Sequence, residues 1–211
     1  MTRTKTTTTA ALLVSAALLL AGCGGQSGDA EPAASGDAGS SASPSASAPA
    51  ETPAAEPAAG ETITGTGYSF SVPEGWAIPE QALPGTEAVD VFVANLTDAS
   101  ADGFADNVNV VLSPAPQAIT ADQVETLGVD ELEGAAGATN VTVEERTTVA
   151  GEESAHLSAS VDQQGVQYNI DQFYPSEGDQ TYVVTFSFST DVTAADRAAV
   201  YESVLATWTW A

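Results

Sequence analysis

Residues 154–188, with the sequence SAHLSASVDQQGVQYNIDQFYPSEGDQTYVVTFSF, decide the fold of this chain. The stretch contains three runs in which β-branched, aromatic or alternating apolar residues predict strands, at 154–161, 166–174 and 181–188. Turn residues separate the runs, with Gln164-Gly165 after the first and residues 175–178 after the second. Short turns join neighbouring antiparallel strands, so the stretch predicts a β-meander.

Four more segments upstream of the meander have strand character. They are residues 68–72, 89–93, 108–112 and 141–148. In the first of them apolar and polar residues alternate with the period of a half-buried strand. Pro73 and Gly75 then turn the chain ahead of Trp76.

Two helices are predicted beside these strands. Thr120 and Gln123 have the spacing of a capping box, so a helix should run from Thr120 to about Glu133, where a glycine-rich segment stops it. A second helix should begin at about Thr193, with large apolar residues on one face: Val200, Val204 and Trp208. Strands in one run with helices at separated points predict an α+β fold, an antiparallel sheet covered by helices.

The N-terminus has the pattern of a targeting segment. Arg3 and Lys5 precede an uncharged run at residues 10–20, which is shorter than the roughly 20 residues that a membrane span needs. Leu20-Ala21-Gly22-Cys23 resembles the lipobox of bacterial lipoproteins, which implies cleavage of a signal peptide at 1–22 and a diacylglyceryl group on Cys23. The alternative is a plain secretory signal that leaves a free thiol. The lipobox predicts a protein held on the extracellular side of the cell membrane by the lipid on Cys23.

A linker and one domain follow this segment. Residues 24–62 contain only Gly, Ser, Ala, Pro, Gln, Thr, Asp and Glu, which supply no apolar surface to offset the entropy of ordering. We therefore predict a disordered linker over 23–62, with an end-to-end distance of roughly 35 Å. All 14 aromatic residues of the chain lie beyond it, which predicts a single folded domain over 63–211.

Charge and composition exclude several kinds of function. The chain has 29 acidic and 4 basic residues, so it has no basic surface for nucleic acid. Lysine is absent after Lys5, which excludes lysine Schiff bases and P-loop phosphate binding in the mature chain. The single cysteine excludes an intramolecular disulfide framework or a cysteine zinc cluster. No motif indicates a cofactor.

His156 is the only histidine and therefore the only imidazole for acid–base chemistry. In the strand predicted at 154–161, the alternation places His156 opposite the apolar residues, together with Ser154, Ser158 and Ser160. We expect a solvated histidine on a polar strand face. A Ser-His-carboxylate arrangement stays open, because such triads are defined by geometry, although the chain has no Gly-x-Ser-x-Gly motif.

Three further patterns have weaker implications. The loop Asp98–Asp106 partly matches a calcium-binding loop but has Asn109 where the twelfth position needs a bidentate carboxylate, so we expect a solvated acidic connection. Adjacent carboxylates at 144–145 and 152–153 point to opposite faces if they lie in strands, so they do not form a glycosidase pair through adjacency. The aromatic residues of the last third should pack between helix and sheet, with Trp210 the most exposed, although they could also line a ligand groove.

Several motifs together resemble the LpqN-like lipoproteins of actinobacteria, which are similar to PsbP-like domains. These motifs are YSFSVPEGW at 68–76, NVNVV at 107–111, Gly151 before the strand with His156, and ATWTW at 206–210. The resemblance implies an α/β/α sandwich on a lipid anchor and brings no catalytic residues.

The predicted function is a non-catalytic binding or assembly module of the envelope, with an envelope protein or a small apolar ligand as its partner. The alternatives are an extracytoplasmic hydrolase that uses His156 and a purely structural spacer.

Overall fold

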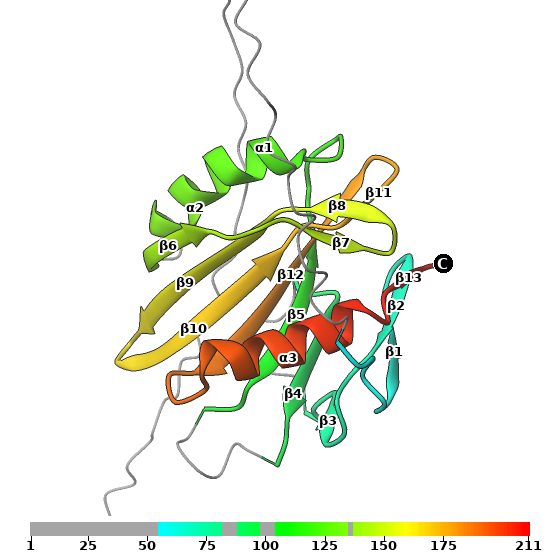
Figure 1. The fold of residues 1–211 in the computed structure, drawn as a ribbon, viewed down its shortest axis with the longest axis vertical. Helices are drawn as coiled ribbons and strands as arrows, with labels where there is room; N and C mark the ends of the chain where they lie inside the picture. Colours follow the sequence, from blue (N-terminus) through cyan, green and yellow to red (C-terminus); the bar gives the residue numbers. More distant parts are fainter. Residues whose placement is uncertain (1–54, 82–87, 98–103, 135–136) are drawn as a thin grey trace, which may run out of the picture. The chain divides into compact units, whose positions relative to one another are not determined.

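The computed structural model describes residues 55–81, 88–97, 104–134 and 137–211 (Figure 1). Cys23, the predicted signal peptide and most of the predicted linker lie outside the described residues. The same holds for residues 98–103 of the candidate calcium loop. Within the described part of the chain, no helix is long and apolar enough to cross a membrane.

The described residues form a large antiparallel sheet with the strand order β3-β4-β5-β12-β10-β9-β6, and β11 pairs with β12. Its strands are β3 (Trp76–Ala77), β4 (Val91–Asn95), β5 (Asn107–Leu112), β6 (Thr139–Val143), β9 (His156–Gln163), β10 (Val166–Phe173), β11 (Ser176–Glu177) and β12 (Gln180–Ser189). Strand β10 pairs with β9 on one side and β12 on the other, so that Tyr168 lies opposite both Val161 and Ser189. The predicted meander is confirmed.

Two smaller sheets flank the large one. A three-stranded sheet has the order β1-β2-β13, formed by β1 (Thr62–Thr64), β2 (Tyr68–Ser71) and β13 (Thr209–Trp210). A hairpin consists of β7 (Thr147–Val149) and β8 (Glu152–Ser154). The single strand predicted at 141–148 is therefore two strands, β6 and β7, and residues 144–146 lie between them. Arg146 lies in this interval and pairs with Glu125 and with Glu153 of the hairpin.

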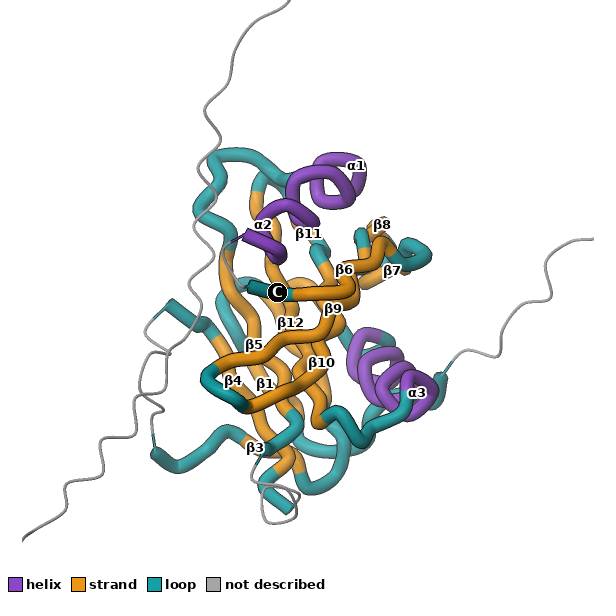
Figure 2. The backbone as a smooth tube through the Cα atoms, turned by 90° about the vertical axis from the view of Figure 1, so that its left-hand side faces the viewer, coloured by secondary structure: helices purple, strands orange, loops and turns teal. Residues whose placement is uncertain are grey.

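Helical segments cover both faces of the large sheet (Figure 2). On one face lie α1 (Ala121–Gln123), the π-helical turn η1 (Val124–Gly128) and α2 (Val129–Gly134). The capping box at Thr120 is present, with the side chains of both partners accepting from backbone N–H groups. On the other face lies α3 (Ala194–Leu205), and Trp208 lies beyond its end instead of on its face. The arrangement is the predicted α+β sandwich.

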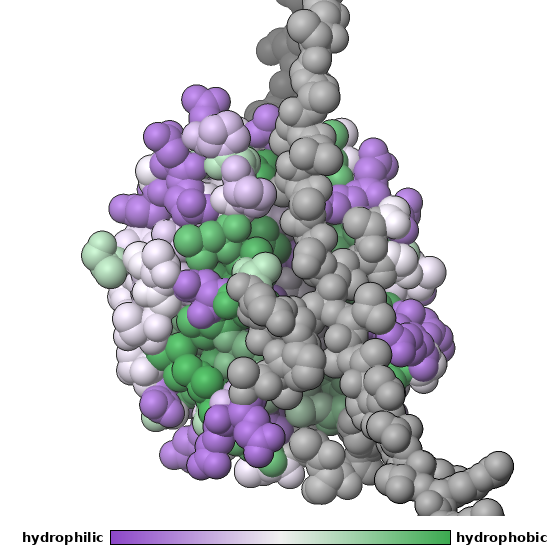
Figure 3. All heavy atoms as spheres, turned by 180° about the vertical axis from the view of Figure 1, so that it is seen from behind, coloured by the Kyte–Doolittle hydropathy of each residue, from purple (hydrophilic) through white to green (hydrophobic). Residues whose placement is uncertain are grey.

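The two faces of the sheet have separate hydrophobic cores. Alternate residues of β12 share the α3 side, where Phe186 and Phe188 are fully buried beside Val204. The opposite face packs under α1 to α2, where Leu157 and Val124 are buried. This face extends beyond the helical cover, and hydrophobic side chains gather at the surface there between hydrophilic margins (Figure 3).

Backbone hydrogen bonds connect residues upstream of position 63 to the folded part of the chain. The backbone N–H of Ala58 donates to the carbonyl of Ser203 at 2.9 Å, and that of Gly60 donates to the carbonyl of Val72 at 2.8 Å. β1 itself begins at Thr62. Residues 58–62 are thus part of the fold, because backbone hydrogen bonds hold a segment that has no apolar signal of its own.

Candidate functional site

His156 is buried, which corrects the expectation of a solvated histidine. Its side chain lies on the face of β9 that α3 covers, and the residue is only 6% exposed. The imidazole stacks on Phe173, with ring centroids 4.2 Å apart, and meets the edge of Tyr201 from α3 at 5.3 Å. The alternation in the sequence correctly separated the two strand faces, but the polar face is covered by a helix instead of water.

Two charged residues join His156 in this buried site. The carboxylate of Asp171 on β10 lies 3.1 Å from His156 Nε2 through Oδ1 and accepts from Arg197 Nε of α3 at 2.9 Å through Oδ2. Asp171 is only 3% exposed, so these partners replace the water that its carboxylate oxygens lose on burial. Burial, with Asp171 nearby, raises the pKa of the Tyr201 hydroxyl to about 12. The cluster therefore ties β9, β10 and α3 together.

The serines near His156 bond to other groups. The hydroxyl of Ser158 donates to Glu144 Oε1 at 2.6 Å. The hydroxyl of Ser154 donates to the carbonyl of Ala155 and accepts from the backbone N–H of Tyr174. A nucleophilic serine must bond to its base, so neither contact is that of a hydrolytic triad. The sequence analysis did not identify Asp171 or Arg197 as site residues. The available signal for Asp171 was its place as an acid inside a predicted strand, and that for Arg197 was that it is one of only two arginines in the domain.

Arg146 has a separate set of acidic partners at the surface. Its Nε donates to Glu125 Oε1 at 2.5 Å, its Nη1 donates to Glu153 Oε1 at 2.8 Å, and its Nη2 bonds to Asp122. These contacts join the helical segment to the β7–β8 hairpin. No group of three His, Cys, Asp or Glu side chains in the described residues is arranged to hold a metal ion.

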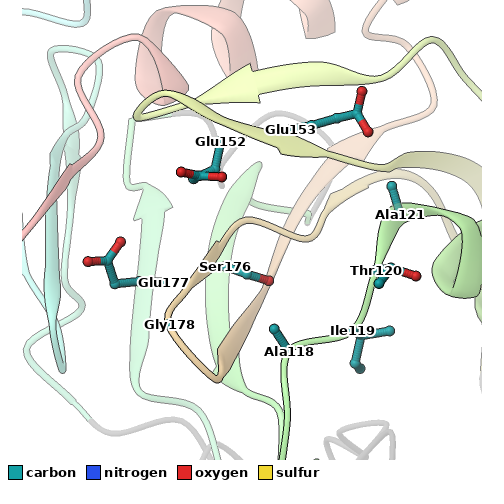
Figure 4. A pocket seen from close by; sticks show the side chains of 9 residues that line it. All are labelled: Ala118, Ile119, Thr120, Ala121, Glu152, Glu153, Ser176, Glu177 and Gly178. Atoms are coloured by element: carbon teal, nitrogen blue, oxygen red, sulfur yellow. The ribbon is translucent and has the colours of Figure 1, made fainter.

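A groove of about 330 Å³ opens beside this hairpin. Three separate segments line it, with Glu152 and Glu153 from β8, residues 176–178 from the β11 turn, and residues 118–121 leading into α1. The carboxylates of Glu152 and Glu177 extend on the same side of the groove, whereas that of Glu153 extends on another side (Figure 4). Arg146 pairs only with Glu153 among these three, so the groove is acidic. Ala118 and Ile119 give it an apolar portion.

The remaining predicted site residues have structural surroundings. Asp106, the described end of the calcium loop, is buried and accepts from the backbone N–H of Ser189 at 2.8 Å. The aromatic residues of the last third pack mainly in the cores, and Trp210 is half-buried against Tyr182. The burial of these aromatic residues in the cores confirms packing as their main role.

Glu131 on α2 is a half-buried acid whose Oε1 has no hydrogen-bond partner among the described residues. Burial raises its pKa. The folded state therefore binds a proton more tightly than the unfolded state, so stability is highest below the ordinary glutamate pKa and falls as pH rises through the raised value. We expect Glu131→Gln to increase stability at neutral pH and to leave it nearly unchanged at about pH 4. Thermal unfolding across this pH range measures both effects.

Glu133→Gln on the exposed side of the same helix is the matched control for this prediction. It removes the same charge and should not reproduce the pH-dependent gain. Equal gains from the two variants would instead attribute the effect to the overall negative charge of the domain.

Comparisons with known proteins give similar folds at low sequence identity. No family model matches the chain, and no curated protein matches it in sequence. The crystal structure of LpqN, described as involved in cell envelope biogenesis of Mycobacterium tuberculosis, matches with 17% identity and a TM-score of 0.48 over 71% of this chain and 88% of that one. The solution structure of PsbP (CyanoP) from Synechocystis matches with 16% identity and a TM-score of 0.48 over 78% and 98%. The chain is similar to both.

A crystal structure from Bacteroides thetaiotaomicron matches with 15% identity and a TM-score of 0.45 over 72% of this chain. This chain spans about half of that protein, because the match covers 48% of its length. LpqN and PsbP are also the proteins that the sequence motifs resemble.

Proposed function

We propose that this protein is a lipid-anchored module of the cell envelope that binds a partner outside the cell membrane and catalyses no reaction. The observation that carries the proposal is the position of the only cysteine, directly after Leu20-Ala21-Gly22 and a short uncharged run. The linker that follows supplies reach, and the folded domain supplies the binding surface. Several acyl-chain methylenes, each worth about 0.8 kcal/mol when buried, would hold the chain on the membrane.

The described site supports binding over catalysis. The histidine that a hydrolase would use lies under α3, and its Nε2 faces Asp171. The groove beside β8 is open to solvent and combines carboxylates with an apolar portion. A groove with this lining can bind a polar or cationic partner group. In the described residues the hydroxyls of Thr120 and Ser176 bond to Gln123 and Thr181, not to the carboxylates of the groove.

The anchoring part of the proposal predicts the behaviour of Cys23→Ser in a lipoprotein-processing bacterium. Nearly all of this variant should leave the membrane fraction, because it lacks the thiol that would be acylated. Fractionation with intact-mass measurement tests this, and the wild-type chain should begin at Cys23 with the added mass of a lipid. Ser40→Ala in the linker is the control and should stay at the membrane. A wild-type protein with an unmodified thiol would refute the anchor.

A further inference from the structure

Strand β6 forms one edge of the large sheet, and within the described residues no strand pairs with its outer side. The backbone N–H of Glu144 donates to the carbonyl of His156 on β9 at 2.9 Å. Hydrogen-bonded and non-bonded positions alternate in antiparallel pairs, so the N–H and C=O of Val143 point away from β9. Val143 is also 43% exposed. The outer side of β6 therefore presents a backbone donor and acceptor beside an exposed apolar side chain.

This edge has few of the features that usually prevent an exposed strand from pairing with another chain. The sequence of β6, TNVTV, contains no charge and no proline, and its composition favours strands. The register shifts between Thr139 and Thr142, and Asn140 has a φ of 54°, so only the part from Thr142 onward is regular. The opposite edge strand, β3, has only two residues in all, so β6 is the longer of the two edge strands. The usable edge is thus confined to the end of β6.

The charges around this edge are negative. Glu144 and Glu145 follow the strand directly, and the neighbouring helix α2 carries exposed Asp130 and Glu133. Arg146, the nearest cation in sequence, pairs with three carboxylates. A second copy of this acidic domain would be repelled, whereas an extended segment that carries Lys or Arg would be attracted.

We propose that β6 accepts a cationic, extended peptide segment of an envelope partner as an added strand. The proposal rests on the binding function proposed above and specifies the mode of recognition. Main-chain hydrogen bonds to Val143 would supply affinity, and the surrounding carboxylates would select a basic segment. The anchor plays no part in this contact, so the contact can be tested on a protein without lipid.

The test uses the full chain with Cys23→Ser in solution and a peptide of about nine residues in which Lys alternates with Val and Thr. A second peptide has Glu in place of Lys. At saturation, the Lys peptide should slow amide hydrogen exchange at Val143 by at least about tenfold. The Glu peptide should not slow it, and the effect of the Lys peptide should weaken as salt is added.

Two variants separate backbone pairing from side-chain contact. Val143→Pro removes the outward N–H, which the fold does not use, and should abolish peptide binding. Val143→Ala keeps the N–H and should retain binding. If the proline variant does not fold, the hydrogen-exchange measurement on the protein with Val143 unchanged tests the proposal by itself.

Three outcomes would overturn the proposal. In the first, the Lys peptide does not slow amide exchange at Val143. In the second, the Glu peptide slows it equally, and in the third, exchange at Val143 slows as the protein concentration rises without any peptide. The third would assign the edge to a second copy of the chain. None of them would affect the fractionation result expected for Cys23→Ser, so the two proposals can fail separately.

Discussion

Asp171→Ala is expected to lower the free energy of unfolding by about 3 kcal/mol. The variant removes the carboxylate that joins His156 of β9 to Arg197 of α3. The Arg197 side chain is 17% exposed and would lose its buried counter-ion, so its charge would be only partly solvated. Urea unfolding of the purified protein measures the loss, and α3 should show the largest gain in amide exchange because its contact with the sheet is weakened.

Asp130→Ala is the matched control, because Asp130 is exposed on α2 and makes no ion pair in the described residues. Its effect should stay within about 0.5 kcal/mol. The double variant Asp171→Leu with Arg197→Met removes both charges and should be more stable than Asp171→Ala, since no unpaired charge stays buried. If Asp171→Ala behaves like the control, the cluster does not hold α3 on the sheet.

The strands of the meander were predictable because local signals specify them. Alternation along residues 154–161 and the turn at Gln164-Gly165 are properties of adjacent residues, and β9 and β10 follow from them. The first helix likewise begins where the Thr120 capping box places it. The π-helical turn at 124–128 was not predictable from this spacing. At its end, Gly128 packs against Leu157, where an added Cβ would lie 3.0 Å from the Leu157 side chain.

The site around His156 shows what alternation alone cannot predict. A period of two separates the faces of a strand but does not say which element covers each face. The face with Ser154 and His156 has a polar composition, yet α3 packs on it and buries Asp171 from the next strand. The ion pair depends on residues 26 positions apart, from Asp171 to Arg197, and their contact exists only in the folded packing.

The backbone contacts of residues 58–62 could not be predicted from the sequence for a related reason. Ala58 and Gly60 have the same composition as the linker before them, so no apolar pattern distinguishes them. They belong to the fold through backbone hydrogen bonds to Ser203 and Val72, which any residue type with a free N–H could make.

The distribution of charge connects the fold to the proposed function. The only histidine and Arg197 support α3 from inside, and Arg146 is held between three carboxylates. Both arginines of the domain are thus used in its own structure, whereas most of its 23 acidic residues face outward. Such a surface repels anionic lipid and other copies of the domain and favours basic partners. The proposed binding of a cationic segment rests on this distribution of charge.

Gly65→Ala is also expected to cost about 3 kcal/mol, by crowding the aromatic core under the β1–β2 hairpin. A Cβ at Gly65 would lie 2.2 Å from Cζ of Tyr68 and 2.6 Å from Oδ2 of Asp90. Tyr68 has no room to move, because its ring is fully buried and stacks on Trp208 with centroids 4.5 Å apart. Its hydroxyl also donates to Asp90 at 2.9 Å, so either the ring or this hydrogen bond must be displaced.

Gly134→Ala is the control for this prediction, because a Cβ at Gly134 has no atom within 4 Å. It should leave stability unchanged or raise it slightly, since alanine favours the helix that Gly134 ends. Tyr68→Phe removes only the hydroxyl and should cost less than Gly65→Ala, because the ring keeps its place on Trp208. Near-ultraviolet circular dichroism, which reports on the stacked rings, should change for Gly65→Ala and not for Gly134→Ala. An unchanged spectrum and stability for Gly65→Ala would mean that the turn at Gly65 shifts away from the Tyr68 ring without cost, and that the hydrogen bonds to Asp90 do not fix this turn.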